Sequence, residues 1–198
     1  MIMNNPLSHL NKYDIILGSG SPRRQELMNG LGLEFSVVKS DVDEIIPEGM
    51  SPNQAPEYLA KLKAEHIVTK LEGNYLLITA DTIVILQDQI LGKPESLTQA
   101  RTMIKALSGV AHTVITGVCI RDQHCEISFN ESTEVQFSKF SDAEIEWFTE
   151  HYSIMDKAGA YGIQEGMGLA KIESMNGSYY NVMGLPTTIL YNHLTEWK

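Results

Sequence analysis

Apolar residues follow two spacings along this chain, one typical of strands and one typical of helices. Short apolar runs predict buried strands at 13–17, 75–78 and 83–86, and a shorter strand at 35–38. Apolar residues recurring three and four positions apart predict helices over 22–31, 51–70 and 96–108. Two long alternating segments, 112–120 and 125–137, predict an antiparallel pair of strands. Strand and helix signals therefore follow one another through the first two thirds of the chain.

The last third is less regular. Ser141 and Glu144 have the spacing of a capping box and predict a short helix. The glycine-rich segment 156–168 has no sustained period, which is typical of a ligand-binding loop and equally of a flexible connection. We expect a short strand at 169–172, a tight turn at 177–182 and a final helix after Pro186.

The first candidate site is the loop that follows the first predicted strand. Gly18 and Gly20 allow a sharp turn and a close approach to a ligand, and Ser21-Pro22 is a typical helix start. Helix N-termini attract anions, and Arg23 and Arg24 add two guanidinium groups that match phosphate oxygens. A capped surface helix with solvated arginines is the alternative, and the strand and glycines in front favour the phosphate site. No Gly-Lys-Ser/Thr follows, so the loop is not a Walker A motif.

Two acidic positions are candidates for chemistry. Asp81 lies among apolar strand residues, where an unpaired carboxylate is costly to bury, so we expect it to face a polar site as a general base or metal ligand. Glu44 ends a carboxylate cluster at 41–44, which is either a solvated turn or, if the loop lines a cleft, a source of a ligand for a divalent cation.

Two lysines are candidates for binding phosphate. Lys63 projects from the edge of the apolar face of the second predicted helix, where it either extends to water or reaches a phosphate in a neighbouring cleft. Lys93 follows Gly92 in a turn, as a loop lysine or as a second ammonium for a polyphosphate.

Composition narrows the class of protein. With 198 residues, 43% hydrophobic and 20% charged, we expect one domain in two lobes around a cleft. A formal net charge of −10 argues against nucleic acid or an anionic membrane surface as partner. The polar N-terminus and the absence of a long apolar run predict a cytoplasmic protein. Cys119 and Cys125 flank a predicted hairpin turn and could face each other, but we expect reduced thiols in a cytoplasmic protein. They lack C-x-x-C spacing and clustered histidines, so we expect no zinc site.

Six motifs in order resemble the Maf family of nucleoside triphosphate pyrophosphatases over nearly the whole chain. They are S-G-S-P-R-R at 19–24 read from Ser19, A-D-T-I-V at 80–84, G-K-P at 92–94, L-S-G at 107–109, D-K-A-G-A-Y-G-I-Q at 156–164, and G-S-Y with G-L-P at 177–179 and 184–186. The resemblance implies a two-lobed α/β fold with an elongated mixed sheet, flanking helices and a central cleft, similar to the inosine triphosphatase architecture.

The same resemblance implies an activity and its residues. It implies a cytoplasmic homodimer that uses Mg²⁺ or Mn²⁺ to split a nucleoside triphosphate into the monophosphate and pyrophosphate, which keeps non-standard nucleotides from being incorporated. Asp81 matches the family's proton acceptor, and Glu44, Lys63 and Lys93 match its acidic and basic cleft residues. We expect phosphate to be bound by Ser19, Ser21, Arg24, Lys63 and Lys93, and the metal by Glu44 and Asp81.

The resemblance also implies which residues select the base. Arg23, Thr82 and Gln164 fall where the family selects the base. The Arg-Arg pair, A-D-T and A-Y-G-I-Q resemble the branch that acts on dTTP and UTP, with modified pyrimidine nucleotides as further candidates, and not the branch that prefers methylated GTP. Gly18 stands where the family usually has alanine, a change that we expect only to loosen the turn.

The chemistry of the candidate residues agrees with the activity that the resemblance implies. Arg24, Lys63, Lys93 and the helix N-terminus at Pro22 would bind a polyphosphate, and water activated by Asp81 or by the metal would attack the α-phosphorus. The alternative from another class is a nucleotide-binding regulator of septum formation and cell-division arrest without turnover.

Overall fold

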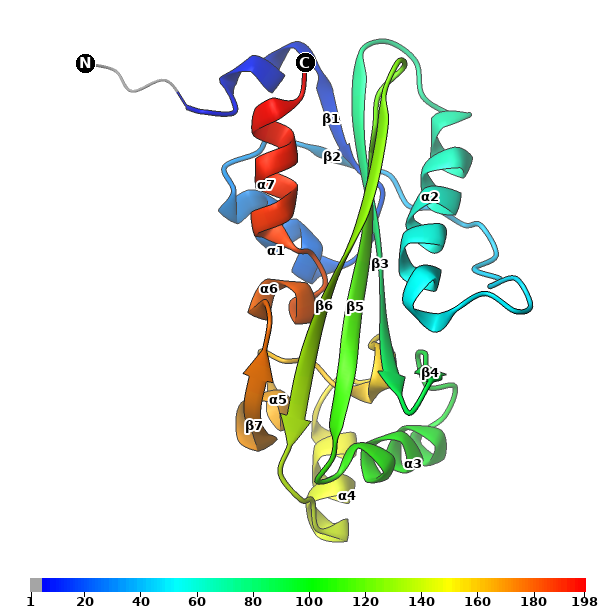
Figure 1. The fold of residues 1–198 in the computed structure, drawn as a ribbon. Coiled ribbons are helices and arrows are strands. Elements are labelled where there is room, and N and C mark those ends of the chain that lie inside the picture. The colour runs from blue at the N-terminus through cyan, green and yellow to red at the C-terminus, as the bar shows by residue number, and fades with distance from the viewer. Residues whose placement is uncertain (1–4) are drawn as a thin grey trace. The chain divides into compact units, whose positions relative to one another are not determined.

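Seven strands form one mixed sheet in the computed structural model, which describes residues 5–198 (Figure 1). The order is β2-β1-β3-β5-β6-β7, and β4 pairs with β3. The strands are β1 (Asp14–Leu17), β2 (Ser36–Val37), β3 (Tyr75–Leu86), β4 (Gln89–Leu91), β5 (Ala111–Arg121), β6 (Glu126–Phe137) and β7 (Ile172–Asn176). The mixed sheet with flanking helices confirms the α/β class that the resemblance implied.

Helices connect these strands. The α-helices are α1 (Pro22–Gly30), α2 (Ala55–Val68), α3 (Leu97–Leu107), α4 (Asp142–His151), α5 (Gly166–Lys171), α6 (Tyr179–Met183) and α7 (Thr187–Glu196). The short 3-10 helices are η1 (Ser8–Lys12), η2 (Pro52–Gln54) and η3 (Ala158–Ala160). No helix within residues 5–198 is long and apolar enough to cross a membrane. The first four residues of the polar N-terminal stretch lie outside the described residues.

Strand directions follow from the connections. β1 runs parallel to both β2 and β3, as expected for strands joined through helices. β3 and β4 are antiparallel, and β7 is antiparallel to β6. β5 and β6 form a hairpin whose turn is closed by a bond from Asp122 N to Cys125 O at 2.9 Å. Cys119 is buried, Cys125 is exposed, and both are free thiols.

The chain divides into two compact units, each with its own apolar core. Unit 1 comprises Met1–Asp81, Gly117–Asn130 and Gly184–Lys198, and unit 2 comprises Thr82–Thr116 and Glu131–Met183. In unit 1, β1 and β3 pack against α2 through Ile16, Leu77, Ala60, Ala64 and Ile67. The core of unit 2 joins α3 and α4 to β5 and β6 through residues that include Ile104, Leu107, Val114, Phe137 and Phe148.

Several predicted elements are confirmed. Ser96 Oγ accepts a hydrogen bond from Gln99 N at the start of α3. The capping box at α4 is complete, because Ser141 Oγ accepts from Glu144 N and Glu144 Oε2 accepts from Ser141 N. The antiparallel pair and the final helix also lie close to the predicted bounds.

Three local predictions were wrong. The apolar runs 75–78 and 83–86 form a single strand, β3, so Asp81 lies inside a strand. Residues 166–171 form helix α5 where a strand was expected at 169–172. Residues 179–183 form helix α6 where a tight turn was expected. Both helices are short and lie beside glycines. The intrinsic helix preference of their residues does not identify them as helices.

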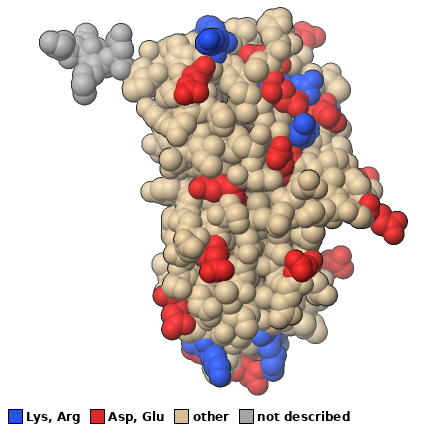
Figure 2. All heavy atoms as spheres, viewed as in Figure 1, with Lys and Arg blue, Asp and Glu red and all other residues tan. Residues whose placement is uncertain are grey.

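Charged side chains on the face drawn in Figure 2 are mostly acidic and are scattered, in keeping with the net charge of −10. Lys and Arg side chains appear at a few separate places on this face. Local clusters of basic groups, rather than the overall charge, must therefore account for any binding of a polyanion.

Candidate functional site

The loop after β1 packs tightly against its neighbours. Gly18 N donates to Ile78 O at 2.7 Å, which continues the pairing of β1 with β3. A Cβ atom on Gly18 would lie 2.5 Å from Thr79 Cγ2 and 2.7 Å from Ile67 Cδ1. The glycine therefore permits a close approach to β3 and α2.

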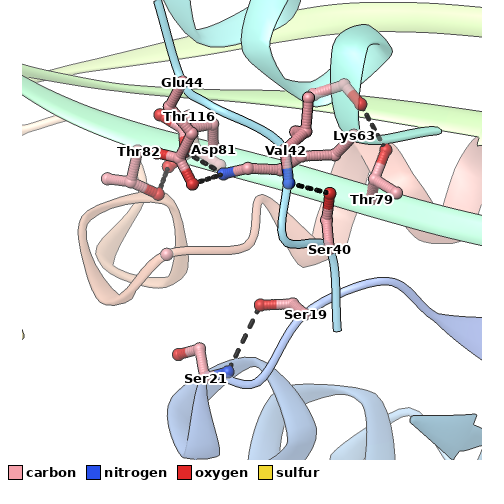
Figure 3. A network of polar contacts seen from close by, with 12 residues as sticks. Ser19, Ser21, Ser40, Val42, Glu44, Lys63, Thr79, Asp81, Thr82 and Thr116 are labelled. Atoms are coloured by element: carbon pink, nitrogen blue, oxygen red, sulfur yellow. Dashed lines mark hydrogen bonds and ion pairs between the residues drawn. The ribbon is translucent and has the colours of Figure 1, made fainter. Parts of the chain in front are cut away.

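Arg24 is the arginine that turns back onto this loop. Ser19 Oγ, which is buried, accepts from Arg24 Nη1 at 3.0 Å and from Ser21 N at 3.3 Å (Figure 3 shows the serine pair). Arg24 Nε donates to Gly184 O at 2.8 Å, so the loop before α7 also holds this side chain. Ser21 is the N-cap residue of α1, but its side chain makes no capping bond.

Burial lowers the pKa of Arg24, and Asp81, Arg23 and Glu44 also act on it electrostatically. Asp81 and Glu44 raise this pKa and Arg23 lowers it, so the guanidinium lies within the field of both candidate carboxylates. Arg23 itself is half-buried. A guanidinium with a very high intrinsic pKa remains charged here, partly desolvated and suited to bind an anion.

Lys63 is buried between two carboxylates. Its Nζ donates to Asp81 Oδ1 and lies 3.0 Å from Glu44 Oε1 (Figure 3). Lys63 and Asp81 are each 7% exposed, whereas the Glu44 side chain is 41% exposed. The alternative in which Lys63 extends to water is therefore wrong, and Glu44 is not a purely solvated turn residue.

Two close contacts to the backbone of α2 position this helix, and with it Lys63. Thr79 Oγ1 donates to Ala60 O at 2.7 Å, which ties α2 to β3. At the start of α2, a Cβ on Gly117 would lie 2.2 Å from Glu57 N, so only glycine in β5 lets the helix approach this closely. The helix therefore presents the ammonium group of Lys63 directly at Asp81.

Glu44 and Asp81 could hold a divalent cation only if a bound substrate supplied further oxygen ligands. Within residues 5–198 no group of three or more His, Cys, Asp and Glu side chains could hold a metal ion. Mg²⁺ in proteins is often bound by one or two carboxylates and completed by phosphate oxygens and water. Glu44 and Asp81, which meet at the same ammonium group, provide a donor set of that kind.

The other predicted site residues belong to unit 2. Thr82 Oγ1 lies 2.9 Å from Thr116 Oγ1, and Thr116 is bonded in turn to Asn181 of α6. Gln164 is half-buried, and its Oε1 is buried without a hydrogen-bond partner among the described residues. A buried amide oxygen without a partner is unusual in a protein, which makes Gln164 a candidate for contact with a ligand. Lys93 is exposed in the turn after β4.

Specific contacts hold the segment that carries Gln164. Lys157, 4% exposed, donates to Ser153 O and lies 3.0 Å from Glu165 Oε1. Tyr161 OH and His112 Nε2 lie 2.7 Å apart, and burial lowers the pKa of His112 to about 4, so the imidazole is neutral. These contacts give the segment 156–168 a defined packing in the structure. Thr116, Lys157 and Asn181 were missed in the sequence because no pattern marks a polar residue as buried.

Comparisons with known proteins agree on one family. A family model described as Maf-like protein matches residues 14–197. The dTTP/UTP pyrophosphatase of Porphyromonas gingivalis is 46% identical over 194 residues, covering 96% of this chain and 98% of that protein. The dTTP/UTP pyrophosphatase of Bacteroides thetaiotaomicron is 46% identical over 191 residues, covering 96% of this chain and 99% of that protein.

A further relative and one solved structure are also similar. The dTTP/UTP pyrophosphatase of Flavobacterium johnsoniae is 44% identical, covering 94% of this chain and 96% of that protein. The crystal structure of a nucleoside-triphosphatase, a dITP/XTP pyrophosphatase from Mycobacterium abscessus, has a TM-score of 0.39 and 12% identity, covering 64% of this chain and 75% of that chain.

Proposed function

This chain belongs to the Maf family, and we propose that it is a nucleoside triphosphate pyrophosphatase that hydrolyses dTTP and UTP to the monophosphate and pyrophosphate. The buried contact of Lys63 with Asp81 and Glu44 is the observation that carries the proposal, together with the relatives that bear this activity in their names. These relatives cover nearly the whole chain.

Binding of the triphosphate is the first task of the site. Arg24 contributes a partly desolvated guanidinium, and Lys63 and Lys93 contribute ammonium groups. Ser19 and Ser21 lie at the N-terminus of α1, where unpaired backbone N–H groups and the helix dipole favour phosphate. Charge-assisted hydrogen bonds to phosphate are about twice as strong as neutral ones, so each of these groups would contribute strongly to binding.

Hydrolysis then needs a base beside the α-phosphate. Asp81 takes the proton as the oxygen of water bonds to the α-phosphorus, and the bond to the bridging oxygen breaks, releasing pyrophosphate. Lys63 stabilises the negative charge of Asp81 before this proton is taken up. Cleavage between the α- and β-phosphates is supported by the names of the relatives.

A divalent cation, Mg²⁺ or Mn²⁺, would be held by Glu44 and Asp81. When bound, it supplies positive charge that neutralises the triphosphate and polarises its oxygens.

Arg23, Thr82 and Gln164 select the base in this proposal. An amide such as that of Gln164 has a donor and an acceptor, which complement the O4 and N3–H groups shared by uracil and thymine. Cytosine has the opposite pattern at these two positions. The buried, unpaired Oε1 of Gln164 supports this role.

The test compares kcat/KM for UTP, dTTP, CTP and GTP. Wild type should prefer UTP and dTTP, and Gln164→Glu, which loses the amide donor, should lower that preference about tenfold or more, since a mismatched buried polar group costs about 1 to 3 kcal/mol. Gln89→Glu, at an exposed position of β4, is the matched control. The proposal fails if wild type cuts CTP as well as UTP. Binding of UTP without release of pyrophosphate would instead identify the nucleotide-binding regulator without turnover.

Location and assembly follow from the same proposal. A cytoplasmic homodimer, acting on dTTP, UTP and modified pyrimidine nucleotides, is supported by the family resemblance. Light scattering should then give twice the chain mass of 22.1 kDa. A mass of a single chain would contradict the dimer and leave the proposed activity in place.

A further inference from the structure

We propose that Asp41 is a positioning residue that docks the segment 40–45 against α2 and thereby holds Glu44 at the ammonium group that Asp81 also contacts. Asp41 acts on a bound cation only through Glu44. The inference rests on the proposed function, in which Glu44 and Asp81 hold a divalent cation, and it adds the contact that keeps one of these two ligands in place.

Glu44 depends on such a contact more than Asp81 does. Asp81 lies inside β3, and the pairing of that strand fixes its backbone. Glu44 lies in the stretch 38–47, which has no regular secondary structure, and its side chain is partly exposed. A ligand has to be held in place before it can bind a cation tightly, so side-chain contacts of this stretch must position Glu44.

Asp41 meets two basic side chains at the C-terminal end of α2. Its Oδ1 lies 2.6 Å from His66 Nε2 and accepts a hydrogen bond from Lys70 Nζ at 3.2 Å. The two basic groups lie 2.8 Å from each other, so the three side chains form one cluster. The hydrogen bond from Lys70 is the largest cause that lowers the pKa of Asp41. The carboxylate therefore stays charged at neutral pH and remains paired.

Spacing links this cluster to the ion pair of Glu44. Lys63, His66 and Lys70 are three and four positions apart, so they follow one face of α2 and of the turn after it. At 1.5 Å per residue, Lys63 and Lys70 are about 10 Å apart along the helix. The three residues of chain from Asp41 to Glu44 span at most about 10 Å. With Asp41 held at one end, the segment has little slack, and Glu44 stays at Lys63, 3.0 Å from its Nζ (Figure 3).

The exposure of the cluster limits the size of the effect. The Asp41 side chain is 79% exposed, and single exposed ion pairs contribute little to the stability of a whole protein. The segment 40–45 is small, so a contact of this size is enough to shift it between docked and undocked positions. We therefore expect weaker cation binding, by about fivefold, and an intact fold when Asp41 is changed.

The experiment measures binding of Mn²⁺ in the presence of α,β-methylene-UTP, an analogue that is not cleaved between the α- and β-phosphates. The signal of free Mn²⁺ in electron paramagnetic resonance gives the Kd. Asp41→Asn should raise this Kd about fivefold, whereas kcat for UTP at saturating Mn²⁺ should stay within about twofold, because Asp41 is placed against neither substrate nor metal. Asp41→Glu, which keeps the carboxylate, should retain a Kd close to that of wild type.

Asp43→Asn is the matched control, because Asp43 is exposed, lies in the same stretch and is adjacent to Glu44. It removes the same charge without touching the cluster, so its Kd should equal that of wild type. An equal rise in Asp43→Asn and Asp41→Asn would show that negative charge alone matters, and would overturn the inference. An unchanged Kd in Asp41→Asn would also overturn it.

A double variant tests the contact between Asp41 and Lys70. Lys70→Met removes the ammonium group and keeps most of the apolar stem, so it should also raise the Kd for Mn²⁺. Combining it with Asp41→Asn should raise the Kd no further than Asp41→Asn alone, because both changes break the same contact. Fully additive changes would mean that the two residues act separately, and would contradict the proposed docking.

Hydrogen exchange in the metal-free protein tests the docking without any ligand. The amides of Val42 and Ile45 donate to Ser40 Oγ and Asp43 O, and in Asp41→Asn a peptide covering 41–46 should exchange about fivefold faster. Unchanged exchange, or faster exchange with an unchanged Kd for Mn²⁺, overturns the inference. Failure of the proposed function appears separately, as absence of pyrophosphate release from UTP and dTTP in wild type, and the exchange rates then still show whether Asp41 holds the segment.

Discussion

Asp81 is the residue on which the proposed chemistry depends most directly. Asp81→Asn keeps the side-chain size but removes the charge that Lys63 neutralises, so the fold should persist while turnover falls at least about 100-fold, the usual scale for loss of a general base. The measurement is pyrophosphate release from dTTP and UTP, with circular dichroism to check folding. Asp142→Asn, at an exposed ion pair with Lys105, is the control. Near-normal turnover in folded Asp81→Asn would remove Asp81 from the mechanism.

Gly18 leaves little room for a side chain. Gly18→Ala would place a methyl group 2.5 Å from Thr79 Cγ2, whose side chain is held by its bond to Ala60 O, so we expect a loss of about 1 to 3 kcal/mol in unfolding free energy. Urea denaturation measures this. Gly30→Ala, where an added Cβ has nothing within 4 Å, should be neutral or slightly stabilising. Equal stability of the two variants would show that the loop after β1 adjusts readily.

At the scale of elements, β5 and the segment 156–168 share a buried pair, His112 and Tyr161. Burial lowers the pKa of His112 from 6.5 to about 4, so the unfolded chain binds a proton at a higher pH than the folded one. The resulting stability is present above pH 6.5 and is lost as the pH falls from about 6.5 to 4. In His112→Gln the decline of the urea midpoint over this window should be shallower. An unchanged slope would assign the decline to other groups.

The whole molecule carries a net charge of −10 and is proposed to bind a highly anionic substrate. Arg24, Lys63 and Lys93 carry three positive charges. The triphosphate carries four negative charges and the two carboxylates add two more, so activity should require a divalent cation. EDTA should abolish pyrophosphate release, and added Mg²⁺ or Mn²⁺ should restore it. Full activity after exhaustive chelation would rule out the metal-assisted scheme.

Much of the candidate site could be predicted from the sequence because its signals are local. Gly18 to Arg24 combines a strand, glycines, a helix start and two arginines within a few residues, and Asp81 stands out as a charge among apolar neighbours. Each signal follows from the cost of burying a charge or from the geometry of a helix terminus. Motifs in order along the chain indicated the family before any contact was known.

Local signals also led to errors where packing decides the backbone. In α5, an added Cβ on Gly168 would lie 2.2 Å from Gly162 O, so this helix exists through a direct backbone contact that spacing along the chain does not encode. The helix α6 is likewise held by the buried amide of Asn181. Short helices have little intrinsic stability, and tertiary contacts determine whether they form.

The sequence by itself determined the order of most elements and the resemblance to the Maf family, and it marked the loop after β1 and Asp81 as candidates for chemistry, because these depend on residue type and near spacing. Only the tertiary structure decided that Lys63 joins Asp81 to Glu44 and that Asn181 reaches Thr116, 65 positions away. The direction of a hydrogen bond depends on which donors and acceptors meet in a buried space, and that is settled only when distant segments pack together.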